Sequence, residues 1–265
     1  MTAMTAFLLD FEPYQLTLMA LLMVTIIPFL FFLLEQQPEL HARLCRDDWQ
    51  VEPAMIGSVG LMFGLFSAFL ANDIWGTNVA ARTAVLQEVD GIHAMLRYSE
   101  PLPNAEGKMM RNVLTIYVKK AIENEWPKMT RGEADPEASN RLRAISNAII
   151  IFEVGKSEGA VIQGRLLEAF NQIRVNWQTR TRIARERQIT IKWQGVILFG
   201  LLTQIAIGLV HFRRLKGMLL AQTIFGWAFA LTTVLLFINE FPFSSLDPIS
   251  AEPLIKTLEV LSNPR

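Results

Sequence analysis

Two patterns in the sequence carry residue types that perform catalysis or bind metals in other proteins. Residues 155–159 read Gly-Lys-Ser-Glu-Gly and match G-x-S-x-G, which needs a strand–turn–helix and a histidine further along the chain. The only histidine further along is His211, at the far end of an apolar stretch, and no sheet is predicted around Ser157. His41, His93 and His211 pair neither with one another nor with Cys45, the only cysteine, at ligand spacing. We therefore predict no enzyme activity, no metal centre and no cofactor.

A cluster of arginines could bind anions, which is better supported than catalysis or metal binding. Five arginines lie shortly before an apolar stretch: Arg174, Arg180, Arg182, Arg185 and Arg187. Beside a bilayer, such a cluster binds anionic lipid headgroups or rings a vestibule that attracts anions. The alternative is a solvated helix face next to a membrane. The carboxylates are scattered over the helices expected in water, and we expect them on solvated faces too.

Amide side chains inside apolar stretches are a third group of candidates. Gln204 and Gln222 each lie in a segment without charge. Polar groups in membrane helices face protein or water, so each amide either bonds to a neighbouring helix or lines a pore. Gln204 is the stronger pore candidate. The middle of these segments contains no Asp, Glu, Lys or Arg, which argues against a proton relay.

The segments that must position these residues are themselves apolar. Of the 265 residues, 51% are hydrophobic and 19% are charged, so the apolar residues must be clustered. Four stretches contain no charged residue: 14–34, 53–71, 193–210 and 217–239. A helix needs about 20 such residues to cross a bilayer. The sequence predicts four transmembrane helices, and its net charge of zero gives no indication of nucleic-acid binding.

The second stretch begins a single long helix that we expect to run from Ala54 to about Tyr98, leaving the membrane and entering water. Small residues follow one another along its first half at steps of three and four: Gly57, Gly60, Gly64, Ser67 and Ala71. In lipid, small residues let two backbones approach closely, so this face either packs on another helix or lines a pore. The same steps continue through Ala81, Val85 and Ile92, with Glu88 among them.

Between the second and third membrane helices we predict an aqueous bundle of helices. After the long helix, helices are expected at 105–129, 137–154 and 160–190, with Pro127 kinking or ending the first of them. A short amphipathic helix is expected after Ser250. The fold class is all-α, and the predicted division is 1–71 (two membrane helices), 72–190 (aqueous domain), 191–239 (two membrane helices) and 240–265 (tail).

Several sequence elements resemble those of a bestrophin-like family of bacterial integral membrane proteins of unassigned function. The resemblance covers about 54–258 and rests on Ala-Phe-Leu-Ala-Asn-Asp-Ile-Trp at 68–75, Glu-Trp-Pro at 125–127 and Pro-Phe at 242–243, with Ile-Ser-Ala-Glu-Pro-Leu at 249–254. The arginine-rich helix adds to it. Members often carry Asp-Arg before the Pro-Phe, where this chain has Glu240 and Phe241. Kinship with bestrophins implies an oligomeric anion channel with four membrane helices per subunit.

The leading hypothesis is an oligomeric pore that conducts ions, with anion conduction implied by the resemblance. The alternative is a membrane-anchored interaction or sensor protein whose helical domain binds a partner. Both predict a lipid bilayer and further copies of the chain as partners, and a multi-pass location in a bacterial plasma membrane. Basic residues in the short loops favour an external aqueous domain, whereas the arginine cluster favours the opposite orientation.

Overall fold

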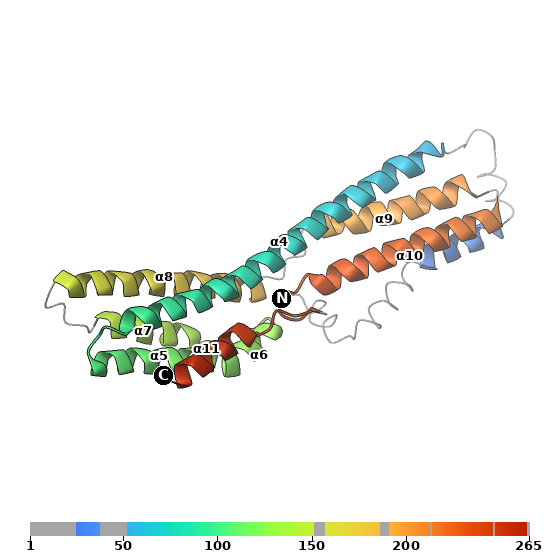
Figure 1. The fold of residues 1–265 in the computed structure, drawn as a ribbon. Helices are drawn as coiled ribbons and strands as arrows, with labels where there is room; N and C mark the ends of the chain where they lie inside the picture. The colour runs from blue at the N-terminus through green and yellow to red at the C-terminus, as the bar shows by residue number, and fades with distance from the viewer. Residues whose placement is uncertain are drawn as a thin grey trace. The chain divides into compact units, whose positions relative to one another are not determined.

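The computed structural model describes residues 25–37, 52–150, 157–185, 191–212, 214–245 and 247–263, and every regular element in these ranges is helical. The all-α prediction is therefore confirmed for the described part of the chain (Figure 1). Its helices are Thr25–Glu35, α4 (Ala54–Ser99), α5 (Asn104–Lys120), the π-helix η2 (Ala121–Glu125), α6 (Trp126–Thr130), α7 (Ala138–Ile150), α8 (Ser157–Arg185), α9 (Ile191–Val210), α10 (Leu215–Asn239) and α11 (Glu252–Ser262).

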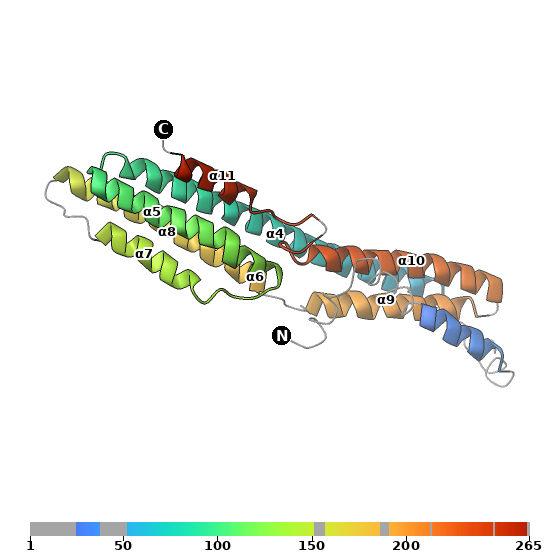
Figure 2. The same ribbon diagram turned by 90° about the horizontal axis from the view of Figure 1, so that it is seen from below.

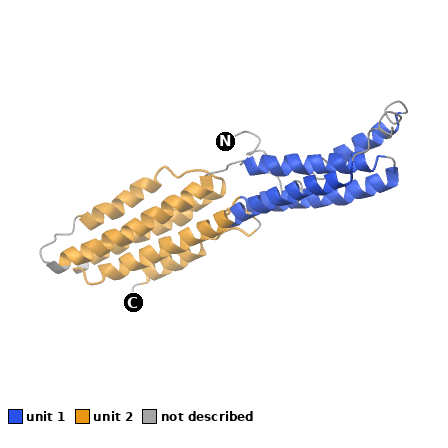
Figure 3. Ribbon diagram, turned by 90° about the horizontal axis from the view of Figure 1, so that it is seen from above, with its two compact units in different colours: residues 1–75, 188–240 blue, residues 76–187, 241–265 orange. Residues whose placement is uncertain are grey.

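Two compact units share the long helix α4. Residues 1–75 and 188–240 form the first, which we call the apolar unit, and residues 76–187 and 241–265 form the second, the bundle unit (Figure 3). The expected continuous helix is confirmed, because α4 runs unbroken through residues 72–80. The connection from α8 to α9 consists of residues 186–190, which lie outside the described ranges.

The apolar unit contains the segments that can cross a membrane. In the described ranges, α4, α9 and α10 are long and apolar enough to do so, and the helix Thr25–Glu35 is shorter. The beginning of the predicted first membrane helix, residues 14–24, lies outside the described residues. Aromatic rings hold the unit together: Phe63 of α4 packs edge-on against Phe225 and Phe229 of α10. The uncharged half of α4 ends at an ion pair between Asp73 and Lys192 of α9.

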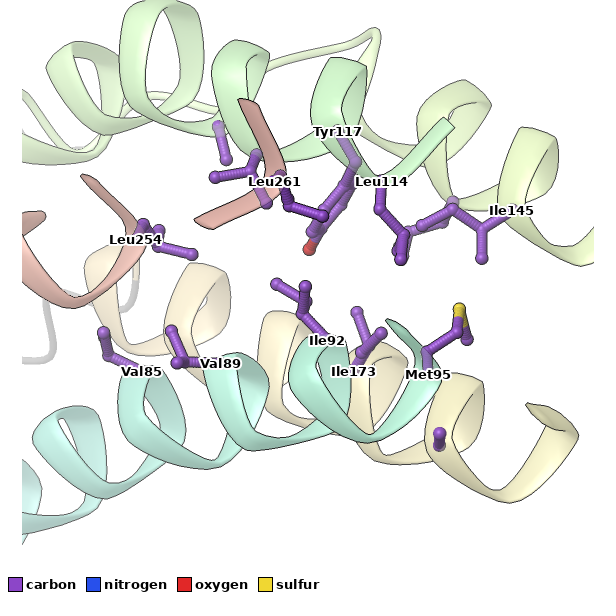
Figure 4. Packing of buried hydrophobic residues seen from close by; sticks show 14 of the residues in the cluster. Val85, Val89, Ile92, Met95, Leu114, Tyr117, Ile145, Ile173, Leu254 and Leu261 are labelled. Carbon is purple, nitrogen blue, oxygen red and sulfur yellow. The ribbon is translucent and has the colours of Figure 1, made fainter. Parts of the chain in front are cut away.

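The bundle unit packs α5, α7, α8 and α11 around the second half of α4 (Figures 1 and 2). Its core is continuous, and Figure 4 shows side chains from all five helices directed toward one another. One face of α8 is apolar and turned toward the core, since Leu166 and Ile173 are fully buried and Phe170 and Trp177 pack against the core. Leu254 and Leu261 place α11 in the same core.

The helix that follows α5 is distorted before Pro127, as expected. Proline has no backbone N–H, and its ring collides with the carbonyl four residues earlier, so a regular turn cannot continue through it. Here the chain forms the π-helix η2, and the N–H of Trp126, the residue that follows it, donates to the carbonyl of Ala121 five residues back. The wider turn brings Glu125 and Trp126 into the core and leaves Glu123 on the outside.

Candidate functional site

The small residues in the first half of α4 lie on a face that the described residues of the subunit leave largely uncovered. A side-chain carbon placed at Gly57 or Gly64 would meet no atom within 4 Å, and one at Gly60 would meet only the methyl group of Thr203, at 3.7 Å. Ser67 and Ala71 are half-buried. In the most apolar part of α4 only 11% of residues are buried, against 50% in α9 and 33% in α10.

The glycines of α9 are placed differently. A Cβ at Gly200 would come within 2.5 Å of the Phe229 ring, and one at Gly208 would come within 2.6 Å of the Phe31 ring and the Gln222 amide. A Cβ at Gly195 would overlap the Phe66 ring. These three positions need glycine because α9 lies against neighbouring side chains of its own subunit. Gly57, Gly60 and Gly64 have no such requirement among the described residues, whereas Gly91, in the second half of α4, lies against Ile173 and Ala169 of α8.

Gln204 and Gln222 are brought together between α9 and α10. Both side chains are fully buried, and the Gln222 amide nitrogen donates to the backbone carbonyl of Gln204 at 3.5 Å. Thr203 is buried beside them and donates to the carbonyl of Phe199. This hydrogen bond joins α9 to α10, which is one of the two roles expected for these amides.

The arginine cluster is divided by the structure. Arg174, Arg182 and Arg185 are exposed on α8, whereas Arg180 is completely buried in the bundle core. Arg187 lies outside the described residues. Residues 180 and 182 are about 200° apart around a helix, so one can be buried while the other is exposed. The predicted contact with anions or lipid headgroups therefore stays a prediction for Arg174, Arg182 and Arg185, whereas Arg180 is enclosed by protein.

Arg180 is the centre of a buried ionic cluster. Its Nε and Nη2 donate to the two carboxylate oxygens of Glu88 on α4 at 2.8 and 3.0 Å, a bidentate arrangement. Its Nη2 also lies 3.5 Å from Oε1 of Glu125, and its guanidinium carbon lies 5.4 Å from the centre of the Trp126 ring. The hydroxyl of Tyr117 donates to Glu88 at 2.7 Å.

Glu125 links this cluster to a second one. Its Oε1 accepts a 2.6 Å hydrogen bond from the indole N–H of Trp177, and its Oε2 lies 3.8 Å from the guanidinium of Arg141 on α7. Arg141 pairs in turn with Asp135, which also accepts a 2.8 Å bond from Lys128. A chain of alternating charges thus runs from Glu88 through the bundle to the loop before α7.

Burial sets the electrostatics of these groups. Desolvation raises the pKa of the Glu125 carboxyl, and the nearby Arg180 opposes that rise. Desolvation also raises the pKa of the Tyr117 hydroxyl, and the charge of Glu88 raises it further. For Arg180, desolvation lowers the pKa, but Glu88 and Glu125 outweigh it and the net shift is upward. Arg180 is therefore always charged, so its charge must be balanced inside the core.

The expectation that carboxylates lie on solvated faces is wrong for Glu88 and Glu125, which are 0% and 1% exposed. A signal was present for Glu88, because it is a charged residue among the apolar residues that recur along α4. Its partners lie 29 and 92 residues further along the chain, so the sequence alone does not identify them. In the described part of the chain, no three His, Cys, Asp or Glu side chains are grouped as a metal site would require.

Comparison with known proteins agrees with the fold. The model of the Bestrophin-like domain matches residues 16–254. Two structures of variants of a bacterial bestrophin homologue from Klebsiella pneumoniae are 13% and 11% identical, with TM-scores of 0.68 and 0.69. The alignments cover 92% and 93% of this chain and 97% and 99% of those chains. A structure described as a membrane protein is 14% identical with a TM-score of 0.67, covering 92% of this chain and 96% of the other. No curated protein matches the sequence.

Proposed function

This chain belongs to the bestrophin-like family, and on that premise we propose that several copies of it assemble into an ion-conducting pore in a membrane. The proposed subunit has four transmembrane helices, at 14–34, in the first half of α4, in α9 and in α10. Residues 72–190 form an aqueous helical domain between the second and third of them. Three of these spans have the length and composition required.

The observation that carries the proposal is the uncovered small-residue face of α4. This segment is uncharged and apolar, yet it is the least buried of the three candidate spans. Gly57 and Gly64 give up about 1 kcal/mol each of helix propensity relative to alanine in water, and no packing among the described residues requires them. Small residues on a membrane helix favour close contact between helices. We infer that the α4 helices of neighbouring copies meet along this face, around or beside the pore.

Anion selectivity is the finer part of the proposal. Arg174, Arg182 and Arg185 are exposed on α8 and provide positive charge outside the predicted membrane span. Rings of arginine or lysine favour anions when several copies surround a pore. The buried Gln204 and Gln222 contribute no charge to the span.

The test is ion flux into liposomes that contain the purified protein, measured separately for chloride and for potassium. We expect flux for the wild type, and a weaker oligomer with less flux for Gly64→Leu. Leu65→Trp is the matched control, because its side chain points about 100° away from Gly64 around the helix. An intact Gly64→Leu oligomer with blocked flux would show that the face lines the pore. Absence of flux in a well-assembled wild type would support the membrane-anchored sensor instead.

A further inference from the structure

The apolar unit contains an acid that the proposed pore does not use. Glu240 follows Asn239, the last residue of α10, and is half-buried. It is also the last residue of the apolar unit, since the bundle unit resumes at Phe241. An acid at the end of a candidate membrane span lies where apolar surroundings give way to water, so its charge depends closely on its contacts.

The surroundings of Glu240 are aromatic. Trp193, in the first turn of α9, is 5% exposed and packs in the core of the apolar unit with Ile74 of α4. The ring of Phe237, one turn before Glu240, lies edge-on to the Trp193 ring at 6.2 Å. The indole N–H of Trp193 is buried and makes no hydrogen bond of normal geometry among the described residues. It lies close enough to the Glu240 carboxyl to lower the pKa of that acid, so the contact between them is weaker than a regular hydrogen bond.

No base among the described residues balances the Glu240 carboxylate. On α9, Lys192 precedes Trp193, but its ammonium pairs with Asp73 of α4. On α10, no charged residue lies between Lys216 and Glu240. Burial therefore dominates: it raises the pKa of the Glu240 carboxyl to about 7, and the Trp193 contact opposes that rise only in part. Both the neutral and the charged form of this acid are consequently populated near neutral pH.

The chain that follows Glu240 is anchored in the bundle unit. Phe243, three residues further on, is 3% exposed and lies edge-on to Trp126, with ring centres 5.6 Å apart. The N–H of Ile249 donates to the carbonyl of Pro242 at 2.9 Å. A displacement of the end of α10 must therefore be taken up by residues 241 and 242 or be passed to the Phe243 ring.

We propose that Glu240 controls the position of the end of α10 by exchanging a proton: the neutral acid stays against Trp193, and the carboxylate leaves this contact for water. The physical cause is the cost of keeping an unpaired charge among aromatic rings. Because α10 is a candidate membrane span, the position of its end then responds to the pH of the solution that reaches Glu240. The inference goes beyond the proposed pore and does not depend on ion conduction.

The direction of the effect follows from the two pKa values of the acid. A glutamate in water has a pKa of about 4.3, whereas the pKa of Glu240 in contact with Trp193 is about 7. Between these values the contact binds more protons than the released form does, so it is most stable below about pH 4.3 and weakens as pH rises to about 7. Across this window the ratio of the contact to the released form should fall by about a hundredfold or more.

The experiment labels the full-length protein in detergent with 5-fluorotryptophan and follows the Trp193 resonance by ¹⁹F NMR from pH 5 to pH 9. Trp193→Phe identifies the resonance. We expect its chemical shift to titrate with a midpoint near pH 7. Its isotope shift between H₂O and D₂O should rise at least twofold from the lowest to the highest pH, because the indole becomes exposed. Glu240→Gln should abolish both changes and resemble the wild type at pH 5.

Histidine is the other side chain that changes charge in this pH range, so His211→Gln, directly after α9, is the matched control and should leave the midpoint unchanged. Loss of the titration in that variant would overturn the proposal. So would a wild-type titration in Glu240→Gln, because another group would then cause it. An isotope shift that stays constant with pH would mean that the acid titrates without leaving the contact, which also contradicts the proposal. Should Glu240→Gln fail to fold, Glu240→Met provides an uncharged side chain of similar length, and a titration retained there would be equally decisive against it.

Discussion

The two units bury polar groups in opposite ways. The core of the bundle unit contains whole charges, with Arg180 fully buried between Glu88 and Glu125. Between α9 and α10 of the apolar unit, the fully buried polar side chains are the neutral amides of Gln204 and Gln222. A charge at the centre of a bilayer costs several kilocalories per mole even by the lowest estimates. In a water-surrounded bundle, a charge is tolerated when opposite charges and hydrogen bonds enclose it.

The comparison also applies to glycine. In α9, glycine lets phenylalanine rings of the same subunit approach the backbone, whereas Gly57 and Gly64, in the apolar half of α4, meet no described side chain. Glycine thus permits close packing in one helix and leaves part of the surface of the other uncovered. The lesson is that a small-residue pattern indicates close approach but does not say to which partner.

The largest effect is expected from a substitution that removes the central charge of the bundle unit. Arg180→Met should destabilise the bundle unit by about 3–5 kcal/mol, because Glu88 and Glu125 would remain buried without their cation. Arg174→Met, on the exposed side of the same helix, should change stability by less than about 0.5 kcal/mol. Urea titration followed by tryptophan fluorescence compares the two. Equal effects would mean that the buried cluster is not what stabilises this unit.

An intermediate effect is expected from alanine at the two kinds of glycine. Gly200→Ala should destabilise the subunit by about 1–3 kcal/mol, since its methyl group would need space that the Phe229 ring occupies. Gly57→Ala has open space and should leave the thermal midpoint of the subunit unchanged or slightly higher. Thermal unfolding in detergent measures both. A clear loss of stability at Gly57 would show that the α4 face is covered, and the same measurement at a protein concentration where the oligomer dissociates would tell whether the subunit itself or a neighbouring copy covers it.

How far the sequence predicts this molecule depends on the range of the interactions. Charge-free stretches locate α9 and α10 to within a few residues, and the recurring apolar positions correctly predict α4 as one helix, because both signals are local. The position of the Glu125 side chain cannot be predicted from local sequence alone, because it depends on tertiary contacts. Pro127 predicts a distortion, but whether the chain responds with a break or a π-helix depends on packing against α7 and α8, which contribute Arg141 and Trp177.

The candidate site residues also differ in whether a local signal or a tertiary contact decides where they lie. Gln204 and Gln222 were named because an amide in a charge-free stretch is conspicuous, and the structure brings them together. The arginine cluster was named as a set, but Arg180 belongs to the core. Its separation from Arg182 depends on the rotation of α8 against α4, which is a tertiary property.

The smallest expected effect concerns pH. Burial raises the folded-state pKa of Glu125 above its unfolded value of about 4.3. Between these two values the native state binds more protons, so this residue makes the protein less stable as pH rises, and its full cost is present above the folded pKa. Glu125→Gln removes that dependence while its amide oxygen still accepts from Trp177. The stability of the variant relative to wild type should therefore be greater at pH 8 than at pH 4, as measured by urea titration at each pH.

A pH-independent difference between wild type and Glu125→Gln would contradict this assignment of the carboxyl. Glu123→Gln is the matched control, because its side chain lies on the outside of the same π-helix. A pH-dependent difference would show that the charged form of a buried acid lowers the stability of the bundle unit, in contrast to the neutral amides of the apolar unit.

The π-helix η2 marks a place where the bundle accommodates one extra amino acid. A π turn holds one more residue than an α turn, so deleting a single residue from Ala121–Glu125 would allow an ordinary α-helix to form. Five residues in the π turn and four in an α-helix both cover slightly more than one turn, so the residues that follow would keep nearly the same orientation relative to α5. A deletion within the regular helix α5 would instead rotate every later residue of that helix by about 100°. Such a rotation would turn Glu125 and Trp126 away from Arg180, although neither had been substituted. The chain can therefore lose a residue such as the outward-facing Glu123 from η2 with less damage to the charge pairing than it can lose one from α5.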